Sequence, residues 1–288
     1  MAVLLAASML SCGCGAMMTS GIGSPFGRSA RVGEYVATLI STQEPYVPSL
    51  HRNPENDRFR IGLLLHPVDG GAPLRLIPIA SGLRHSDYRN SARVLGWDGR
   101  HVWFVGQDIG AYDLRARRLV RLEDLRRANR GLDGLWQNAR YGFGRRLQIT
   151  SHDYRQEYEV EPETLRAAPA VGLRRPSGLE AIRATLGGPA ADQYRRRPGP
   201  IEGVERVTAL RNKAGLDSTI ALRRVDASGK EMWTVETGIA DLDQVLPDAR
   251  QIALVGRRVA VPNKVQEPVL AIVDVETGRL AAHSLWQR

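Results

Sequence analysis

The sequence predicts an all-β fold built from repeated hairpin modules. Short stretches that alternate apolar and polar residues recur at roughly 8–12-residue spacing, which is typical of all-β proteins. Three phrases from the first half of the chain return in the same order in the second half. The composition agrees, because 43% hydrophobic residues supply a core while 29 glycines and 16 prolines supply many turns.

Residues 1–18 predict an export signal or an N-terminal membrane anchor. An apolar run, Ala2–Leu10, is followed by small residues and by Cys12 and Cys14. This order resembles a bacterial lipoprotein signal, which implies lipid attachment at Cys12 or Cys14. A cleaved secretory signal, a buried helix and an uncleaved anchor are alternatives, since Ala2–Met18 reaches the lower limit of about 17–25 residues for a membrane span. The expected location is the periplasmic face of the cell envelope, with membrane contact through the N-terminus.

Residues 19–33 are rich in Gly and Ser and predict a flexible linker, so the folded body is expected to span 34–288. Both cysteines of the chain precede this body. A disulfide framework, a CxxC zinc site and a cysteine nucleophile are therefore excluded from it.

The repeat is clearest between the regions that begin at Leu63 and at Ile220. A shift of 157 residues places Val68-Asp69 over Val225-Asp226, and the same shift places Gly99 over Gly256 and Val102 over Val259. After four extra residues, 109–120 resembles 270–281, which pairs Asp113 with Asp274. Residues 145–167 form a partial third copy. Internal repeats of this kind indicate a modular fold.

The hairpin at 220–239 shows what one module contains. Apolar residues alternate up to Val225, Asp226 and Gly229 form a tight turn, and Trp233 lies on the returning strand. We expect the Trp233 ring to fill the gap between neighbouring sheets, because burying it removes about 150–250 Å² from water. The alternative, a stacking platform for a ligand, is disfavoured because the first copy has Leu76 at this place.

The phrase VDASGKEMWTVETG resembles the repeat of PQQ-like (quinoprotein-type) β-propellers, to which Asp226, Gly229, Lys230 and Trp233 correspond. It also resembles uncharacterised bacterial envelope proteins. The resemblance implies a β-propeller-like repeat of four-stranded antiparallel sheets. At roughly 40–50 residues per blade, the body has room for five or six blades or for an irregular ring. One or two short helical insertions are expected, at 121–132 and 177–197.

Motifs for catalysis or for metal and cofactor binding are missing. The six histidines lack zinc-ligand spacing, and neither a GxSxG elbow nor a phosphate-binding loop occurs. The acidic residues Asp241, Asp243 and Asp248 could offer oxygen ligands to calcium, but a solvated connector is favoured. We therefore predict no catalytic residue, no metal ligand and no cofactor.

The net charge of +9 comes mainly from arginine, because the chain has three lysines. Aromatic residues do not cluster with the basic ones, so nucleic acid is not an expected partner. The leading hypothesis is a non-enzymatic, envelope-tethered binding or scaffold protein with a protein partner. An enzyme (hydrolase, lyase or quinone-dependent oxidoreductase) with its site in a central channel is the alternative. A third hypothesis is that the arginines face anionic lipid or polysaccharide. The sequence leaves the oligomeric state open.

Overall fold

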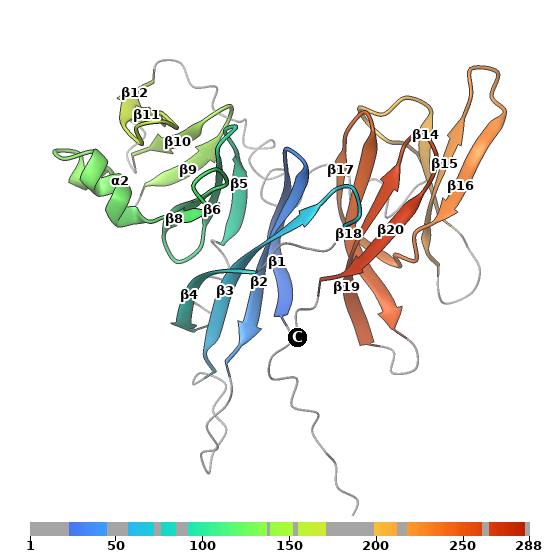
Figure 1. Ribbon diagram of the computed structural model, residues 1–288, viewed down its shortest axis with the longest axis horizontal. Helices are drawn as coiled ribbons and strands as arrows, with labels where there is room; N and C mark the ends of the chain where they lie inside the picture. The colour runs from blue at the N-terminus through green and yellow to red at the C-terminus, as the bar shows by residue number, and fades with distance from the viewer. Residues whose placement is uncertain are drawn as a thin grey trace, which may run out of the picture.

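The structure, a computed structural model, describes residues 23–44, 57–71, 76–84, 92–136, 139–151, 155–170, 199–211, 218–260 and 265–285. Within these ranges the chain forms five four-stranded antiparallel sheets, which we call A to E in chain order. Each sheet is a meander of four consecutive strands (Figure 1). The prediction of an all-β, propeller-like fold is thus confirmed, with five sheets in the described part of the chain.

The strands of each sheet follow one another closely in the sequence. Sheet A contains β1 (Gly23–Val32), β2 (Tyr35–Gln43), β3 (Phe59–Pro67) and β4 (Ile77–Leu83). Sheet B contains β5 (Arg93–Trp97), β6 (His101–Val105), β7 (Ile109–Asp113) and β8 (Arg118–Val120). Sheet C contains β9 (Arg140–Phe143), β10 (Leu147–Thr150), β11 (Glu157–Val160) and β12 (Ala167–Pro169). Sheet D contains β13 (Gly199–Pro200), β14 (Val207–Arg211), β15 (Ile220–Val225) and β16 (Glu231–Glu236), and sheet E contains β17 (Asp241–Pro247), β18 (Gln251–Ala260), β19 (Val265–Asp274) and β20 (Leu280–Ser284).

The helical insertion predicted at 121–132 is present. Helix α2 (Leu122–Ala128) and the 3-10 helix η2 (Asp133–Trp136) connect sheet B to sheet C. Leu122 and Leu125 of α2 are buried against the core between these two sheets. The helix predicted at 177–197 lies outside the described residues, as do residues 1–18 with Cys12 and Cys14.

The folded body begins earlier than the sequence indicated, because β1 lies inside the predicted linker 19–33. It pairs with β2 along most of its length, with an irregularity between Phe26 and Ala30. Val32 is fully buried, and Ser29 is buried and hydrogen-bonded to sheet E. Gly and Ser residues in this stretch favour a loop, but strand pairing and burial of Val32 outweigh their local preference.

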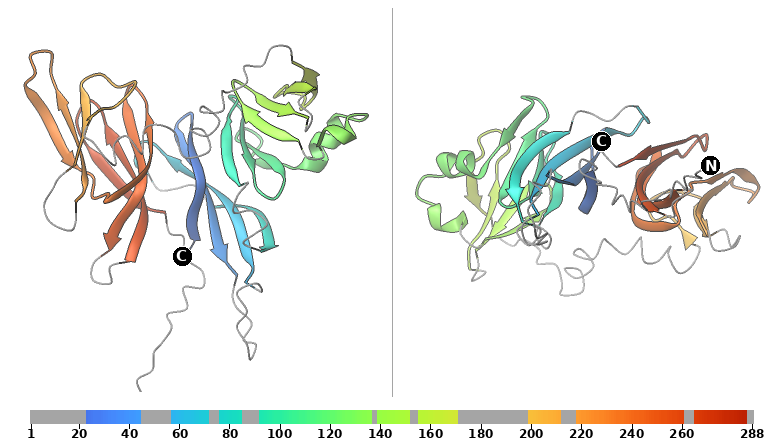
Figure 2. Two further views of the ribbon diagram at one scale, coloured as in Figure 1. Left: turned by 180° about the vertical axis from the view of Figure 1, so that it is seen from behind. Right: turned by 90° about the horizontal axis from the view of Figure 1, so that it is seen from below.

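Four apolar clusters give the order of the sheets in space. One cluster joins A to B, one joins B to C, one joins A to E, and one joins D to E. The spatial order is therefore C–B–A–E–D, an open arc with sheet A near its middle (Figures 1 and 2). Sheets C and D form the two ends, and residues 171–198, which join them in sequence, lie outside the described part.

The A–E interface brings together the first and the last sheet of the chain. Val36, Ile40 and Leu64 of sheet A pack against Leu270 and Ile272 of sheet E. The backbone N–H of Ser29 donates to Oε1 of Gln244 at 2.7 Å across this interface, and both residues are buried. Contact between residues so distant in sequence holds the two halves of the arc together.

The outward faces at the two ends of the arc differ. On sheet C, Gln148 donates a 3.1 Å hydrogen bond to Glu159, on the face opposite buried Leu147 and Ile149. On sheet D, exposed Arg223 and Thr234 share their face with Leu210 and Ala221, and Met232 of the same sheet is exposed. The end of sheet C is thus polar, whereas that of sheet D combines polar and apolar residues.

Candidate binding surface

The turn between the third and fourth strand begins with an aspartate in four of the five sheets. These are Asp69, Asp113, Asp226 and Asp274, and in each the Oδ1 atom accepts backbone N–H groups of the following residues. A carboxylate that accepts hydrogen bonds from the N–H groups of its own turn fixes the turn backbone, so the turn needs no additional hydrogen bonds between the strands. The structure therefore places two pairs of repeat residues at equivalent positions. Val68-Asp69 corresponds to Val225-Asp226, and Asp113 corresponds to Asp274.

Trp233 lies at the interface between sheets D and E. Its ring packs against the apolar cluster of these sheets, and its Nε1–H donates to the carbonyl oxygen of Val275 at 3.1 Å. A Cβ atom on Gly278 would lie 2.7 Å from Trp233 Cγ, so the ring rests directly on the turn of sheet E. The aromatic ring thus links one module to its neighbour. Leu76 is half-buried against the A–E cluster.

The pairing of Val102 with Val259 does not hold in the structure. Val102 is the second residue of β6, whereas Val259 is the last residue but one of β18. Gly99 lies in a turn, but Gly256 lies inside a strand, where a Cβ would meet the carbonyl oxygen of Asp241 at 2.5 Å. The glycine of β18 therefore serves close strand approach and not turn formation.

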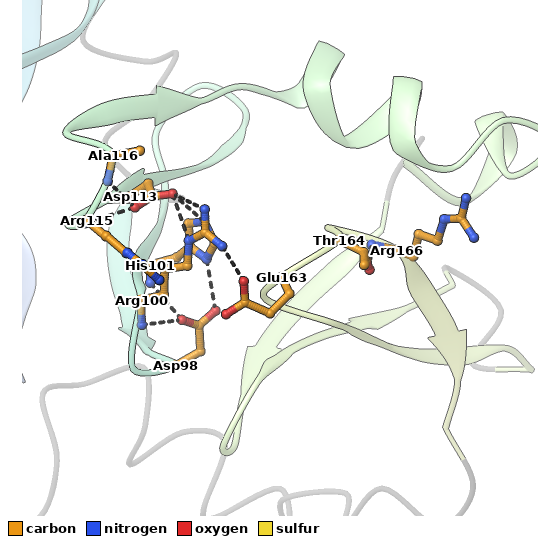
Figure 3. A network of polar contacts seen from close by, with 9 residues as sticks. All are labelled: Asp98, Arg100, His101, Asp113, Arg115, Ala116, Glu163, Thr164 and Arg166. Carbon is orange, nitrogen blue, oxygen red and sulfur yellow. Dashed lines mark hydrogen bonds and ion pairs between the residues drawn. The ribbon is translucent and has the colours of Figure 1, made fainter.

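A buried polar network, which sequence reasoning missed, lies at one end of the central strands β6 and β7 of sheet B (Figure 3). The indole Nε1–H of Trp103 donates to Asp98 Oδ2 at 2.6 Å, and the N–H of His101 donates to Asp98 Oδ1 at 2.7 Å. The His101 ring lies between two carboxylates, 3.4 Å from Asp98 and 3.5 Å from Asp113. Burial opposes ionisation of Asp98, but contacts from His101, Trp103 and Arg100 outweigh it and lower its pKa to about 2.

The network continues to the surface through Arg100. Its guanidinium contacts Asp113 Oδ2 at 2.8 Å and Glu163 Oε2 of the sheet C turn at 2.6 Å (Figure 3). Because Asp113 also accepts the N–H groups of Arg115 and Ala116, one carboxylate anchors the β7–β8 turn, Arg100 and His101. His101 is 1% exposed, so a substrate cannot reach it, and the network serves to fix the turn.

A cavity of about 130 Å³ lies at the other end of β7 from this turn, between β4 of sheet A, the β6–β7 connection and the β8–α2 connection. Its walls are largely apolar and include Ile79, Phe104, Ile109 and Leu122. Charged groups of both signs also line it, namely Arg121, Asp108 and Glu123. The volume suits one side-chain-sized group and is well below the roughly 300–1,000 Å³ of sites for larger ligands.

Exposed arginines follow the same segment of chain. We call the following set the arginine surface: Arg115, Arg117, Arg118, Arg121, Arg126, Arg127 and Arg130. They extend from the β7–β8 turn along β8 to helix α2. Residues 115–130 contain two carboxylates beside these seven arginines, those of Glu123 and Asp124. Sequence reasoning noted the excess of arginine but not this concentration, although the signal is visible in 115–130.

Helix α2 holds its part of the arginine surface in place through Asn129. This buried side chain donates to the carbonyl oxygens of Leu125 and Leu165 and accepts the N–H of Ala167. The helix end is thereby tied to the β11–β12 turn of sheet C.

The described residues hold no group of three or more His, Cys, Asp or Glu side chains placed to bind a metal ion. Among the helices of the described part, none is both long and apolar enough to cross a membrane. The acidic residues Asp241 and Asp243 lie on β17, and Asp243 contacts Arg257 at 3.7 Å.

Comparison with family models and with curated proteins gave no match. Among solved structures, the chain is similar to the β-propeller domain of the trilobed protease from Pyrococcus furiosus, with 12% identity over 91% of this chain and 70% of that one, and a TM-score of 0.28. A proposed 6-phosphogluconolactonase from Bacteroides uniformis is 14% identical over 90% of this chain and 71% of that one, with a TM-score of 0.24. The description as a β-propeller-like protein rests on the five sheets themselves, since similarities this weak carry no functional argument.

Proposed function

We propose that this chain is a non-enzymatic binding or scaffold protein of the bacterial cell envelope. The observation that carries the proposal is the locked turn after the third strand, which recurs in four sheets with an aspartate carboxylate fixing its backbone. Side chains beyond these aspartates, such as Arg117, Ala227 and Glu276, are exposed. Because the backbone of these turns is already fixed, little backbone entropy is lost when a partner binds them.

Site-specific photo-crosslinking in cells tests this proposal. A photoreactive amino acid at Ala116 or Ala227, both exposed tips of locked turns, is expected to capture a discrete protein partner in envelope fractions. The same group at Thr234, an exposed position in the middle of a strand of sheet D, serves as the matched control. Recovery of the same background from all three positions would overturn the proposal.

The envelope location is supported by the apolar leader and by Cys12 and Cys14. Attachment of a lipid to one of these cysteines would hold the β-propeller-like body at the membrane surface. Metabolic labelling with a palmitate analogue tests it. Label that is lost in either Cys12→Ser or Cys14→Ser identifies the site, whereas an unlabelled, fully soluble chain would argue against a lipoprotein.

A further inference from the structure

We propose that the arginine surface and the cavity beside it bind an acidic peptide segment that carries one apolar side chain. This inference rests on the proposed function, because it names the partner chemistry of a binding protein. It draws on three independent features: the charge of residues 115–130, the rigidity of their backbone, and the size of the cavity.

The first feature is uncompensated charge. Asp124 is already engaged, since it accepts the N–H of Arg121 at 3.0 Å and contacts Arg127 at 3.5 Å. Among the described residues, no carboxylate forms an ion pair with Arg115, Arg117 or Arg118. Planar guanidinium groups bind carboxylates through paired hydrogen bonds, which makes an acidic chain the matching ligand.

Two arginines on sheet E meet carboxylates of their own sheet. Arg258 contacts Glu267 at 2.6 Å and Arg257 contacts Asp243 at 3.7 Å. Exposed arginines elsewhere on sheets D and E, such as Arg250 and Arg279, stand singly, so what is local to residues 115–130 is the concentration of seven exposed arginines in sixteen positions.

The second feature is a fixed backbone under the arginine surface. Asp113 is fully buried and anchors the β7–β8 turn, while Leu125 and Asn129 anchor helix α2. The charges are consequently held in register before a partner arrives, which reduces the entropy lost on binding.

The third feature, the cavity, decides between kinds of partner. Its volume of about 130 Å³ is close to the roughly 150 Å³ of a protein cavity that binds benzene, so it accepts one apolar side chain. A lipid acyl chain is too long for it, and an anionic polysaccharide offers no matching apolar group. Arg121 lines the cavity and belongs to the arginine surface, which joins the two. Because Asp108 and Glu123 also line the cavity, the apolar side chain of the segment enters it while the acidic residues contact the arginines of β8 and of the β7–β8 turn.

The experiment measures the affinity of the full chain for defined probes by fluorescence anisotropy. The probe is a short labelled peptide of Glu and Ser with one central Leu. The triple variant Arg115→Gln, Arg117→Gln, Arg118→Gln is expected to weaken binding by about tenfold or more. The matched control, Arg223→Gln, Arg250→Gln, Arg279→Gln, removes equal charge from exposed positions on sheets D and E and is expected to change the affinity by less than about threefold.

Two further arms test the cavity. Replacing the Leu of the probe with Ser is expected to cost about tenfold, because the buried apolar surface is lost. Ala80→Phe, which fills the cavity from β4, should weaken the Leu probe while leaving the Ser probe unchanged.

Equal losses in both triple variants would overturn the inference, since net charge alone would then explain binding. Tighter binding to vesicles of anionic lipid than to the peptide, or no binding to any probe, would also overturn it. If photo-crosslinking still captures a partner in such a case, the proposed function stands and only the partner chemistry is wrong.

Discussion

Gly278 and Gly229 offer a matched test of how sheet D docks on sheet E. Both lie in the turn after the third strand of their sheet and have a positive φ, +71° and +84°. A Cβ on Gly278 would lie 2.7 Å from Trp233 Cγ and 2.8 Å from Cδ2, whereas a Cβ on Gly229 meets no atom within 4 Å. The two positions thus share backbone strain and differ in contact with the indole ring.

The expected magnitudes follow from these distances. Alanine in a left-handed conformation costs about 1–2 kcal/mol, and this is the whole expected loss for Gly229→Ala. Gly278→Ala adds the overpacking of a buried contact, about 1–3 kcal/mol, so its total loss is about 2–5 kcal/mol. The extra loss should largely disappear in a Trp233→Ala background, since alanine lacks the Cγ and Cδ2 atoms that a Cβ on Gly278 would meet.

Urea unfolding followed by circular dichroism measures these losses for the two glycine variants in both backgrounds. The double-mutant cycle is expected to give a coupling of about 1–3 kcal/mol between Gly278 and Trp233, and none between Gly229 and Trp233. Equal losses for the two glycine variants, or an extra loss at Gly278 that persists in full with alanine at position 233, would refute the packing of Trp233 on the sheet E turn.

Three further predictions follow from the described contacts. Burial lowers the pKa of both His66 and His283, whose rings lie 4.2 Å apart at the A–E interface. Because the unfolded chain then takes up protons at a higher pH than the folded one, the free energy of unfolding should decrease as the pH is lowered below about 6.5. Urea titrations at a series of pH values check this, and in a His66→Phe/His283→Phe variant the free energy of unfolding should change less steeply with pH. Arg117 has a φ of 53° at the turn position where sheet E has Gly278, and its side chain is exposed, so Arg117→Gly should raise the free energy of unfolding by about 1 kcal/mol; a loss would contradict the strain. Trp103→Phe removes the hydrogen bond to Asp98 and should lower the free energy of unfolding by about 1.5–3 kcal/mol more than Trp97→Phe does. The reason is that Trp97 Nε1 is buried without a hydrogen-bond partner in the described structure, so its replacement breaks no hydrogen bond. Similar melting temperatures for the two variants would count against the network.

The third-to-fourth-strand turns could be predicted because their chemistry is local. An aspartate followed by small or polar residues satisfies its own turn, so Asp69, Asp113, Asp226 and Asp274 leave a readable pattern wherever the turn recurs. The pattern was enough to identify modules and to place Trp233 on a returning strand, from which its packing against the next sheet was expected.

The second strands could not be aligned correctly because glycine has two uses. Gly99 supports a turn before the five-residue strand β6, whereas Gly256 permits close approach inside the ten-residue strand β18. Because glycine serves a turn at one position and close strand approach at the other, the alignment matched Val102 to Val259 incorrectly. Strand length, which tertiary packing sets, would have been needed to separate them.

Local sequence patterns do not predict which sheets lie next to each other, and they do not predict the arginine surface. Alternating Val, Ile and Leu residues state that a face is buried but not which sheet covers it, so the A–E interface had no signature in the sequence. The sequence around His101 gives no sign of the polar network, because only the fold brings Asp113 within 3.5 Å of its ring. The concentration of arginine at 115–130 was readable, but its exposure was not.

The contact between the first and the last sheet is the claim on which the arc depends, and proton NMR tests it most directly. The chain contains six histidines, so selective labelling of imidazole carbons gives a simple spectrum that His66→Gln and His283→Gln assign. With ring centroids 4.2 Å apart, a strong nuclear Overhauser effect is expected between the His66 and His283 rings. Its absence at neutral pH in the folded protein would show that sheets A and E do not meet, and would contradict the arrangement C–B–A–E–D.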